Sequence, residues 1–304
     1  MTLQQLRYLV TVAECCNVSE AAERLFISQP SLSLAIRNLE KEMGIRAFSR
    51  TNKGVRITRD GEELLAYARQ LLEQAEIMEE HFGKSTDRQP KFSVSCQHYS
   101  FAVNAFVEVI KEFDADSYDF VLRETQTGEI IDDVANGLSE LGIIYTGRHN
   151  EEYLSKLIKK NGLTFTRLYD AKPHVFISSE HPLACKKSIE LEELKAYPYL
   201  TYEQGSHNSF YFSEEFLSTL DMPKNIQVRD RATLFNLVIG LNGFTVSSGI
   251  IDRRLNSEYI IARPLNVDYI MHIGMVTGRN VLLSRYAESY IDKLKNCLSD
   301  AEQG

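Results

Sequence analysis

The segment SEAAERLFISQPSLSLAIRNLEKEMGIRAFSR, residues 19–50, decides the fold of the N-terminal part of this chain. Its middle, Ser28-Gln29-Pro30, joins a hydroxyl that can cap a helix to a proline in the first turn, where a missing N–H costs little. Apolar residues then recur at helical spacing up to Gly44, namely Leu32, Ala35, Ile36, Leu39 and Met43. The segment therefore predicts a helix that begins near residue 29 and ends at a glycine.

Two more helices are predicted before this one. Ser19 is the expected N-cap of a short helix, with Glu20 and Glu23 in the first turn, where acids meet the positive end of the helix dipole. The buried face of that helix is expected to consist of Val18, Ala21, Ala22 and Leu25. Further upstream, apolar residues step by three and four, which indicates an amphipathic helix that contains Leu3, Leu6, Val10 and Ala13.

The face of the third helix opposite its apolar stripe carries short polar groups at its start and a cation further along. These residues are Gln29, Ser31, Ser33, Leu34, Arg37 and Asn38. Two short helices joined by a tight turn, the second displaying donors and acceptors at its N-terminal end, fit the DNA major groove. Glutamine can pair with adenine edges, arginine with guanine or phosphate, and serine with either kind of group. The pattern predicts a reader of double-stranded DNA.

A turn-rich tip, Thr51-Asn52-Lys53-Gly54, follows between two short segments of strand character. This arrangement predicts a wing, whose cations would hold the DNA backbone or minor groove beside the recognition helix: Arg50, Lys53 and Arg56. A lone arginine or lysine is usually a solvated surface charge, and two adjacent helices are often part of a bundle. The ordered set of helices, turn and wing favours the DNA reader over both alternatives.

The sequence resembles the LysR-type transcriptional regulators through LQQLRYLVTVAE (3–14), the segment quoted first, and GVRITRDGEELL (54–65), and the resemblance covers residues 1 to about 85. In that family the first two turns of the recognition helix contact bases. The resemblance therefore implies base contacts from Gln29, Pro30, Ser31 and Ser33, with wing contacts from Arg50 and Lys53. Where many members have a basic or long polar residue, this chain has Leu34, so an apolar contact, for example to a thymine methyl, is expected there.

A long helix is predicted from Arg59, with Thr58 as its cap. Its apolar residues recur at intervals of 4, 3, 4, 3 and 4, which is a heptad seam: Leu64, Ala68, Leu71, Ala75, Met78 and Phe82. Over roughly 36 Å at about 1.5 Å per residue, this seam is expected to pair with a second copy, although packing on the chain's own effector domain is the alternative. A two-fold pair of readers predicts an operator of inverted half-sites, and the resemblance implies dimers or tetramers.

We expect three parts: a winged helix-turn-helix domain (1–58), a linker or dimerisation helix with its hinge (59–90), and an effector-binding domain (91–304). From Phe92 onward, short strand-like segments alternate with helical ones, which indicates an α/β domain with a parallel sheet. Two lobes are expected, lobe I at about 91–162 and 265–304 and lobe II at about 163–264. YLTYEQGS (199–206) and GLNGFTVSSGI (240–250) resemble the effector domain of the same family, which is similar to periplasmic solute-binding proteins.

A ligand site is expected beyond the carboxyl ends of the strands, where helix N-termini offer free N–H groups to anions. This rule selects Gln97, His98, Tyr99, Ser100, Tyr145, Thr146, Thr201, Tyr202, Thr245 and Ser247. The resemblance adds weight to Ser100, Thr201 and Tyr202. Each of these side chains could equally cap a helix or cover the core. Hydroxyls, an amide and one histidine suit a small polar metabolite such as an amino acid derivative or a carboxylate.

The charge of the 304-residue chain is distributed unevenly. The net charge is −8, yet residues 24–59 hold eight basic and two acidic side chains, whereas residues 89–304 hold 22 basic and 29 acidic ones. One end can meet phosphates and the other should avoid them. No apolar run is long enough to span a membrane and no signal-like start is seen, so a cytoplasmic protein without a membrane partner is expected.

Other functions are less well supported by the sequence. No glycine-rich phosphate loop, GxSxG, HExxH or metal-spaced cluster is present, so neither an enzyme nor a cofactor is expected. The five cysteines lack CxxC spacing, and for Cys96 a packed thiol is favoured over a redox sensor or a nucleophile beside His98. A transport-type solute-binding protein would leave the basic reader unused. Promoter DNA, a small effector, further copies of the chain and RNA polymerase are the expected partners.

Overall fold

The computed structural model describes residues 1–51, 54–81, 89–113, 116–205, 210–216, 222–251 and 259–300. Lys53 and Phe82, predicted for the wing and the dimer seam, lie outside these residues. The chain divides into two compact units, one of Met1–Arg88 with Ala135–Leu138 and one of Gln89–Val134 with Ser139–Gly304. Each unit is described by itself below.

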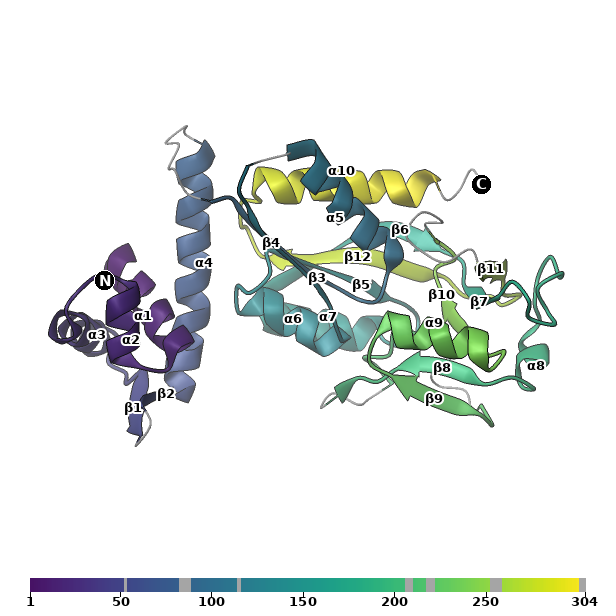
Figure 1. The fold of residues 1–304 in the computed structure, drawn as a ribbon, viewed down its shortest axis with the longest axis horizontal. Helices are drawn as coiled ribbons and strands as arrows, with labels where there is room; N and C mark the ends of the chain where they lie inside the picture. Colours follow the sequence, from purple (N-terminus) through teal and green to yellow (C-terminus); the bar gives the residue numbers. More distant parts are fainter. Residues whose placement is uncertain are drawn as a thin grey trace. The chain divides into compact units, whose positions relative to one another are not determined.

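Three helices and a hairpin begin the first unit: α1 (Leu3–Cys15), α2 (Val18–Arg24), α3 (Gln29–Met43), β1 (Phe48–Thr51) and β2 (Gly54–Ile57) (Figure 1). Helices α2 and α3 pack through their predicted apolar faces, but α1 does so only in part: it buries Leu6, Leu9 and Val12, whereas Leu3 of the predicted stripe is 43% exposed. The most deeply buried side chains of this core are Leu6, Leu9, Val12, Ala21, Leu32 and Leu39. The short side chains of Ala21 and Ala22 line the buried face of α2. The order of helix, short helix, recognition helix and wing is the predicted one.

The helix ends follow local chemistry, with one difference from the prediction. Asn17, and not Ser19, caps α2, because its side-chain oxygen accepts hydrogen bonds from the backbone N–H groups of Ser19 at 2.9 Å and Glu20 at 3.4 Å. Asparagine is as good an N-cap as serine, and the helix can therefore begin two residues earlier, at Val18. Ser28 caps α3 as predicted, and Gly44 ends it in the left-handed conformation with φ of +71°.

The wing is an antiparallel hairpin in which Phe48 pairs with Ile57 and Thr51 pairs with Gly54. Val55 donates a backbone hydrogen bond to the carbonyl of Cys16 at 2.9 Å, which fastens the wing to the end of α1. Gly54 has a φ of +139°, and a Cβ there would collide with the same carbonyl oxygen. Glycine is therefore required at the start of β2, since no other side chain fits both the backbone conformation and the close approach.

Helix α4 (Arg59–His81) begins at the cap formed by Thr58, whose hydroxyl accepts from the N–H of Gly61 at 3.0 Å. The predicted seam is divided in the structure. Ala68 is fully buried and Leu64 half-buried in the apolar core of the reader, so Ala68 has no surface left for a second chain and its assignment to a dimer seam is wrong. Ala75 is half-buried, while Leu71 and Met78 are 46% and 52% exposed.

The second unit is built on a five-stranded sheet of order β4-β3-β5-β12-β6 (Figure 1). Its strands are β3 (Lys91–Cys96), β4 (Asp119–Glu124), β5 (Leu141–Thr146), β6 (Leu163–Ala171) and β12 (Met271–Gly278). The first three are parallel, as predicted, but β12 runs antiparallel to both of its neighbours. Since β6 pairs with β12, a strand about 100 residues later, it belongs to this sheet and not to the lobe expected from residue 163 onward.

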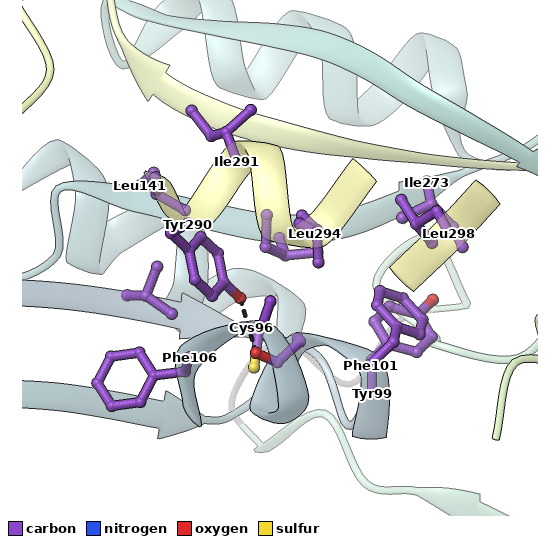
Figure 2. Packing of buried hydrophobic residues seen from close by; sticks show 14 of the residues in the cluster. Cys96, Tyr99, Phe101, Phe106, Leu141, Ile273, Tyr290, Ile291, Leu294 and Leu298 are labelled. Atoms are coloured by element: carbon purple, nitrogen blue, oxygen red, sulfur yellow. Dashed lines mark hydrogen bonds between the residues drawn. The ribbon is translucent and has the colours of Figure 1, made fainter. Parts of the chain in front are cut away.

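Four helices cover this sheet: α5 (Ser100–Phe113), α6 (Thr127–Ala135), α7 (Glu151–Lys160) and α10 (Arg285–Asp300). α5 and α10 lie together on one face, with α6 and α7 on the other (Figure 1). Figure 2 shows the core beneath α5 and α10, where the hydroxyl of Tyr290 donates to the carbonyl of Ala102 at 3.1 Å. Cys96 is completely buried in this cluster.

The other part of this unit holds smaller sheets. The antiparallel set has the order β10-β7-β11 and consists of β7 (His174–Ser178), β10 (Thr245–Ser247) and β11 (Ile260–Pro264). The parallel pair is β8 (Tyr199–Tyr202) with β9 (Asn225–Val228), and a bridge from Tyr199 to Phe244 links it to the antiparallel set. Helices α8 (Leu191–Leu194) and α9 (Arg231–Gly240) complete the unit. The mixture of parallel and antiparallel pairs differs from the all-parallel arrangement expected from alternation.

Candidate functional site

Two surfaces can carry function, and the first is the outer face of α3. Gln29, Pro30, Ser31, Leu34 and Arg37 are exposed there, and Ser33 is half-buried. Gln29 donates from its side-chain amide to the Ser33 hydroxyl at 2.8 Å, and Arg37 donates from Nε to the Ser33 carbonyl at 3.2 Å. Both long side chains are therefore tied to one residue and lie along one face of the helix. The structure brings the predicted α3 residues together on a single surface.

The wing adds positive charge to the same unit. Arg50 on β1 and Arg56 on β2 are both exposed, and they flank the tip that contains Lys53. Arg50 pairs in register with Val55, so both arginines lie close to the end of the hairpin. Guanidinium groups at such a position can meet phosphate oxygens.

Phe26 is a residue of this surface that the sequence analysis did not select. It lies in the turn between α2 and α3, has a φ of +54° and is 96% exposed. A large aromatic residue rarely adopts this conformation and rarely remains so exposed. The sequence did contain a sign of this exposed residue, because Phe26 is an apolar residue in the tight turn just before the helix that starts with Gln29.

The second candidate is a pocket in the larger unit, of about 320 Å³ when the open space at its mouth is included. Its walls come from the loop after β3, from β7, β8 and β10, from α9, and from the segment 210–216. The lining residues are His98, Tyr99, Phe176, Tyr202, Glu214, Glu215, Phe235, Thr245, Val246 and Ser247. Five of the predicted ligand residues, His98, Tyr99, Tyr202, Thr245 and Ser247, are thus brought together.

The other five predicted residues do not line the pocket. Gln97, Ser100, Tyr145, Thr146 and Thr201 are all buried. Gln97 donates to the Thr127 hydroxyl at 2.6 Å and accepts from the backbone N–H of Tyr145 at 2.8 Å, so both ends of its amide bind the protein itself. It joins β3, β5 and α6, and a direct contact between Gln97 and a ligand finds no support in this geometry.

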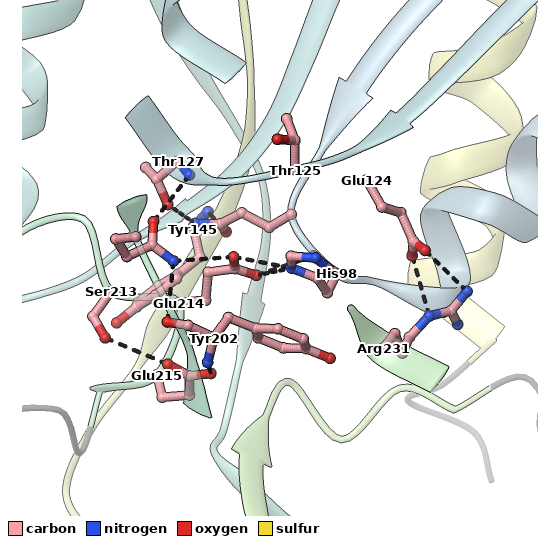
Figure 3. A network of polar contacts seen from close by, with 12 residues as sticks. His98, Glu124, Thr125, Thr127, Tyr145, Tyr202, Ser213, Glu214, Glu215 and Arg231 are labelled. Atoms are coloured by element: carbon pink, nitrogen blue, oxygen red, sulfur yellow. Dashed lines mark hydrogen bonds and ion pairs between the residues drawn. The ribbon is translucent and has the colours of Figure 1, made fainter. Parts of the chain in front are cut away.

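A buried histidine–glutamate pair forms one wall of the pocket (Figure 3). The carboxylate of Glu214 lies 3.0 Å from Nδ1 of His98 and accepts from the backbone N–H of His98 at 3.0 Å. The ring of His98 stacks on that of Tyr202, with centroids 3.8 Å apart and planes within 7°. Burial lowers the pKa of His98, but the charge and hydrogen bond of Glu214 raise it by more, so the net pKa of His98 is raised. The pair favours the protonated imidazole.

Further hydrogen bonds fix Glu214 in place. The side-chain amide of Gln204 donates to Glu214 at 3.2 Å, while its oxygen accepts from the backbone N–H of Thr127 at 3.1 Å. The Thr127 hydroxyl in turn donates to the carbonyl of Phe212 at 2.7 Å. Figure 3 shows this network, which connects the segment 210–216 to the start of α6 and to the loop before α5.

Glu215, the next residue, is only 1% exposed. One carboxylate oxygen accepts from the backbone N–H of Tyr202 at 3.0 Å, and the other accepts from the Ser213 hydroxyl at 3.4 Å. Burial raises the pKa of Glu215 well above its ordinary value, and the nearby charge of Glu214 raises it further. The sequence analysis missed both glutamates; their signal was a pair of acids in Ser213-Glu214-Glu215-Phe216, between apolar residues.

Cys96 is a packed thiol, as the sequence favours. Burial raises the pKa of Cys96 well above its ordinary value, and the charge of Glu124 adds to this rise. A thiol that remains protonated is a poor nucleophile and a poor metal ligand. The part of the chain that the structure describes contains no cluster of three or more histidine, cysteine or carboxylate side chains that could hold a metal ion. Within that same part, no helix combines the length and apolar character needed to cross a bilayer.

Comparison with known proteins matches a family profile to each of the two parts of the chain that hold these surfaces. Residues 3–62 match the profile of the bacterial regulatory helix-turn-helix proteins of the lysR family, and residues 90–298 match that of the LysR substrate binding domain. The uncharacterized HTH-type transcriptional regulator YnfL of Escherichia coli strain K12 is 30% identical over 216 residues, which span 69% of this chain and 68% of that protein.

Two solved structures share the fold. A full-length OxyR variant from Pseudomonas aeruginosa has a TM-score of 0.71 at 23% identity and covers 98% of this chain and 95% of its own. The structure of full-length CbnR in complex with its target DNA has a TM-score of 0.59 at 16% identity and covers 98% of this chain and 100% of its own. At these identities the likeness concerns the fold alone.

Proposed function

The chain belongs to the LysR family of bacterial transcriptional regulators, and from this premise we propose that it reads inverted-repeat promoter DNA as a dimer or tetramer and responds to a small molecule held in its pocket. The family consists of regulators and not of enzymes. The observation that carries the DNA-binding proposal is the outer face of α3, where Gln29, Ser31 and Arg37 are exposed on a helix that starts with a satisfied cap.

The proposed docking places the first two turns of α3 in the major groove. Gln29, Pro30, Ser31, Ser33 and Leu34 would face base edges, and Arg37 would reach a guanine or a phosphate. Arg50 and Lys53 of the wing would bind the adjacent backbone. The excess of basic over acidic side chains in residues 24–59 supports this proposal, as does the solved complex of CbnR with its target DNA.

The exposed part of α4 supports the dimer. Leu71 and Met78 are seven residues apart and Tyr67 lies one turn before Leu71, so the three exposed side chains share one helix face. Two such faces from two copies would bury each other and place two readers on inverted half-sites. Further pairing into tetramers and contact with RNA polymerase at the promoter belong to the same proposal.

The pocket is the proposed effector site. Its residues come from six segments, namely the loop before α5, β7, β8, β10, α9 and the segment 210–216. These segments can adopt more than one relative arrangement, and a ligand that binds one arrangement more tightly than another would increase the population of the first. We propose that the shift alters the angle between the paired readers and thereby the bend of the bound DNA.

Selection of genomic fragments tests this function directly. The full-length protein, immobilised and incubated with sheared genomic DNA plus excess unrelated duplex, is expected to enrich a small number of fragments. Binding of these fragments should weaken steeply with salt, since phosphate contacts release counterions. If the enrichment disappears when unrelated duplex is present in excess, the proposal that the protein binds specific promoter sequences is wrong.

A further inference from the structure

The pocket contains more negative than positive groups, which bears on the kind of molecule it takes. Two of its ten lining residues are glutamates, and His98 is the one lining side chain that can carry a positive charge. No arginine lines the pocket, and two arginines that follow β9 pair with carboxylates outside its lining, Arg231 with Glu124 and Arg229 with Glu203. This charge distribution differs from that of a site built for an anion.

The groups suited to a ligand carboxylate are already used by the chain. The backbone N–H and ring of His98, in the loop just before α5, and the side-chain amide of Gln204 all bind Glu214. Ligand anions are expected beyond the carboxyl ends of strands, next to helix N-termini, and Glu214 places its own carboxylate at this position. An added carboxylate would meet the negative charge of Glu214, which His98 already pairs, and would itself raise the cost of ionising Glu215, without a free cation among the described lining residues.

Glu215 is the lining carboxyl that has no basic partner among the described residues. It is almost fully buried, and no lysine, arginine or histidine side chain of the described residues lies within ion-pair distance of it. Its hydrogen bonds come from a backbone N–H and a serine hydroxyl. An ionised carboxylate buried without a counter-charge is costly, which is why the pKa of Glu215 is raised and the group keeps its proton in the free chain. A bound ammonium group would offset that cost and allow the carboxyl to ionise.

The remaining lining residues suit the rest of an organic cation. Phe176 and Phe235 offer aromatic surface, which attracts cations at its faces and contacts an apolar stem. Tyr99 is 4% exposed, lines the pocket, and its hydroxyl has no hydrogen-bond partner in the described structure. Thr245 and Ser247 add two hydroxyls that can accept from an N–H donor.

We propose that this pocket binds a small organic cation, an amine whose ammonium group pairs with Glu215 and whose apolar stem packs against Phe176 and Phe235. The proposal rests on the effector role of the pocket and narrows it to one chemical class. The ammonium donates to Glu215 and to the hydroxyls of Tyr99 and Thr245, which provides a partner for every N–H. The sequence suggests an amino acid derivative or a carboxylate; this proposal keeps the amino group of the first class and replaces the carboxylate of the second.

Matched probes of one shape and different charge test the proposal. The full-length protein is titrated with benzylamine, benzoate and benzyl alcohol, and with n-butylamine, butyrate and 1-butanol, at constant ionic strength and neutral pH, by thermal unfolding and calorimetry. At least one amine is expected to raise the melting temperature saturably at millimolar concentration, because a ligand that binds only the folded state stabilises it. The matching acid and alcohol are expected to have no saturable effect. Equal or stronger stabilisation by an acid, or no response to either amine, overturns the proposal.

The variant Glu215→Gln assigns the binding to the carboxylate. Glutamine keeps an acceptor for the N–H of Tyr202 and removes the charge, so affinity for the active amine is expected to fall at least about tenfold, which equals about 1.4 kcal/mol. Glu180→Gln, which removes an exposed carboxylate outside the lining of the pocket, is the matched control and is expected to change the affinity less than twofold. If Glu215→Gln binds the amine as tightly as wild type, Glu215 is not the group that pairs with the ammonium. The titrations of wild-type protein test the cation proposal even if this variant does not fold.

Binding of the genomic fragments selected above is measured on the same preparations. Fragment binding without any response to the amines defeats the cation proposal and leaves the regulator intact. Saturable amine binding without selection of any genomic fragment supports the cation proposal and defeats the proposal that the protein reads DNA.

Discussion

At the scale of single residues, Gln29 and Glu215 illustrate how differently the two sites are built. Gln29 is exposed and held by one bond to a residue a turn away, so its position follows from the local helix. Glu215 is buried, and its partner Tyr202 lies in a strand 13 residues earlier. A reading residue must remain available to DNA, whereas a pocket residue is positioned by the packed interior.

Replacement of Gln29 by alanine is expected to weaken binding to the selected fragments by about 1–3 kcal/mol, the usual contribution of a good bidentate base contact. Binding to random duplex should remain nearly unchanged, since phosphate contacts are kept. Fluorescence anisotropy with both DNAs measures the two affinities. Gln4→Ala, an exposed glutamine on α1, is the control and should leave both intact; an equal loss on both DNAs for Gln29→Ala would mean that Gln29 does not read bases.

Glu215→Gln is also expected to change how stability depends on pH. The folded-state pKa of Glu215 is raised, so the folded chain keeps this proton while the unfolded chain loses it as the pH rises above the ordinary carboxyl value. Its contribution to the free energy of unfolding is therefore fully present below that value and declines as the pH rises toward the folded pKa. Glutamine cannot ionise, so without ligand the melting temperature of the variant relative to wild type should increase from acid to neutral pH. A difference that is constant with pH would contradict the buried, uncompensated carboxyl.

Residue positions were predictable where they depend on neighbours in sequence. The exposed α3 face, the Ser28 cap and the Thr58 cap follow from helix geometry and capping, which act within four residues. Glu214 was not predictable, because its partner His98 lies 116 residues earlier and nothing near Glu214 announces the pair. Gln97 was assigned to the ligand for a related reason, since its position at a strand end does not reveal that Thr127 and Tyr145 already use its amide.

At the scale of elements, periodicity predicted most helices and strands within a few residues. The helix expected from near residue 29 to Gly44 is α3, Gln29–Met43, and the long helix expected from Arg59 is α4, which begins at that residue. What periodicity cannot supply is the partner of an apolar face. The spacing in α4 was read as one continuous seam, yet Ala68 packs on the reader of its own chain and Leu71 does not. β6 was likewise placed in the wrong lobe, because its neighbour β12 is remote in sequence.

Leu71 and Met78, the exposed residues of the predicted α4 seam, are expected to contribute to self-association. In the double variant Leu71→Glu, Met78→Glu, self-association is expected to weaken by at least about tenfold, because burying these side chains contributes about 1.5–3 kcal/mol each and buried charges oppose pairing. Sedimentation velocity across a range of protein concentrations measures the change. Ile239→Glu on α9 introduces the same charge at another partly exposed apolar position and should leave the assembly unaltered. Wild-type protein that is already monomeric at micromolar concentration, or an unaffected double variant, would exclude this face as the interface.

At the scale of the whole molecule, the charge is divided in the same way as the fold. The unit with α3 and the wing includes the basic stretch of residues 24–59, and the unit with the pocket includes the acidic remainder. The net charge of −8 therefore does not argue against DNA binding, because the basic side chains are concentrated in the unit that holds α3 and the wing. A regulator of this design separates the surface that reads DNA from the pocket that senses a ligand.

The central claim is that two copies of α3 enter successive major grooves of one duplex, and a footprint on the fragments enriched by selection tests it most directly. Hydroxyl-radical footprinting with the full-length protein is expected to protect two inverted half-sites whose centres are separated by about one helical turn, roughly 10–10.5 base pairs, or a multiple of it. Protection of a single, unrepeated site, or uniform protection without boundaries, would contradict the paired readers.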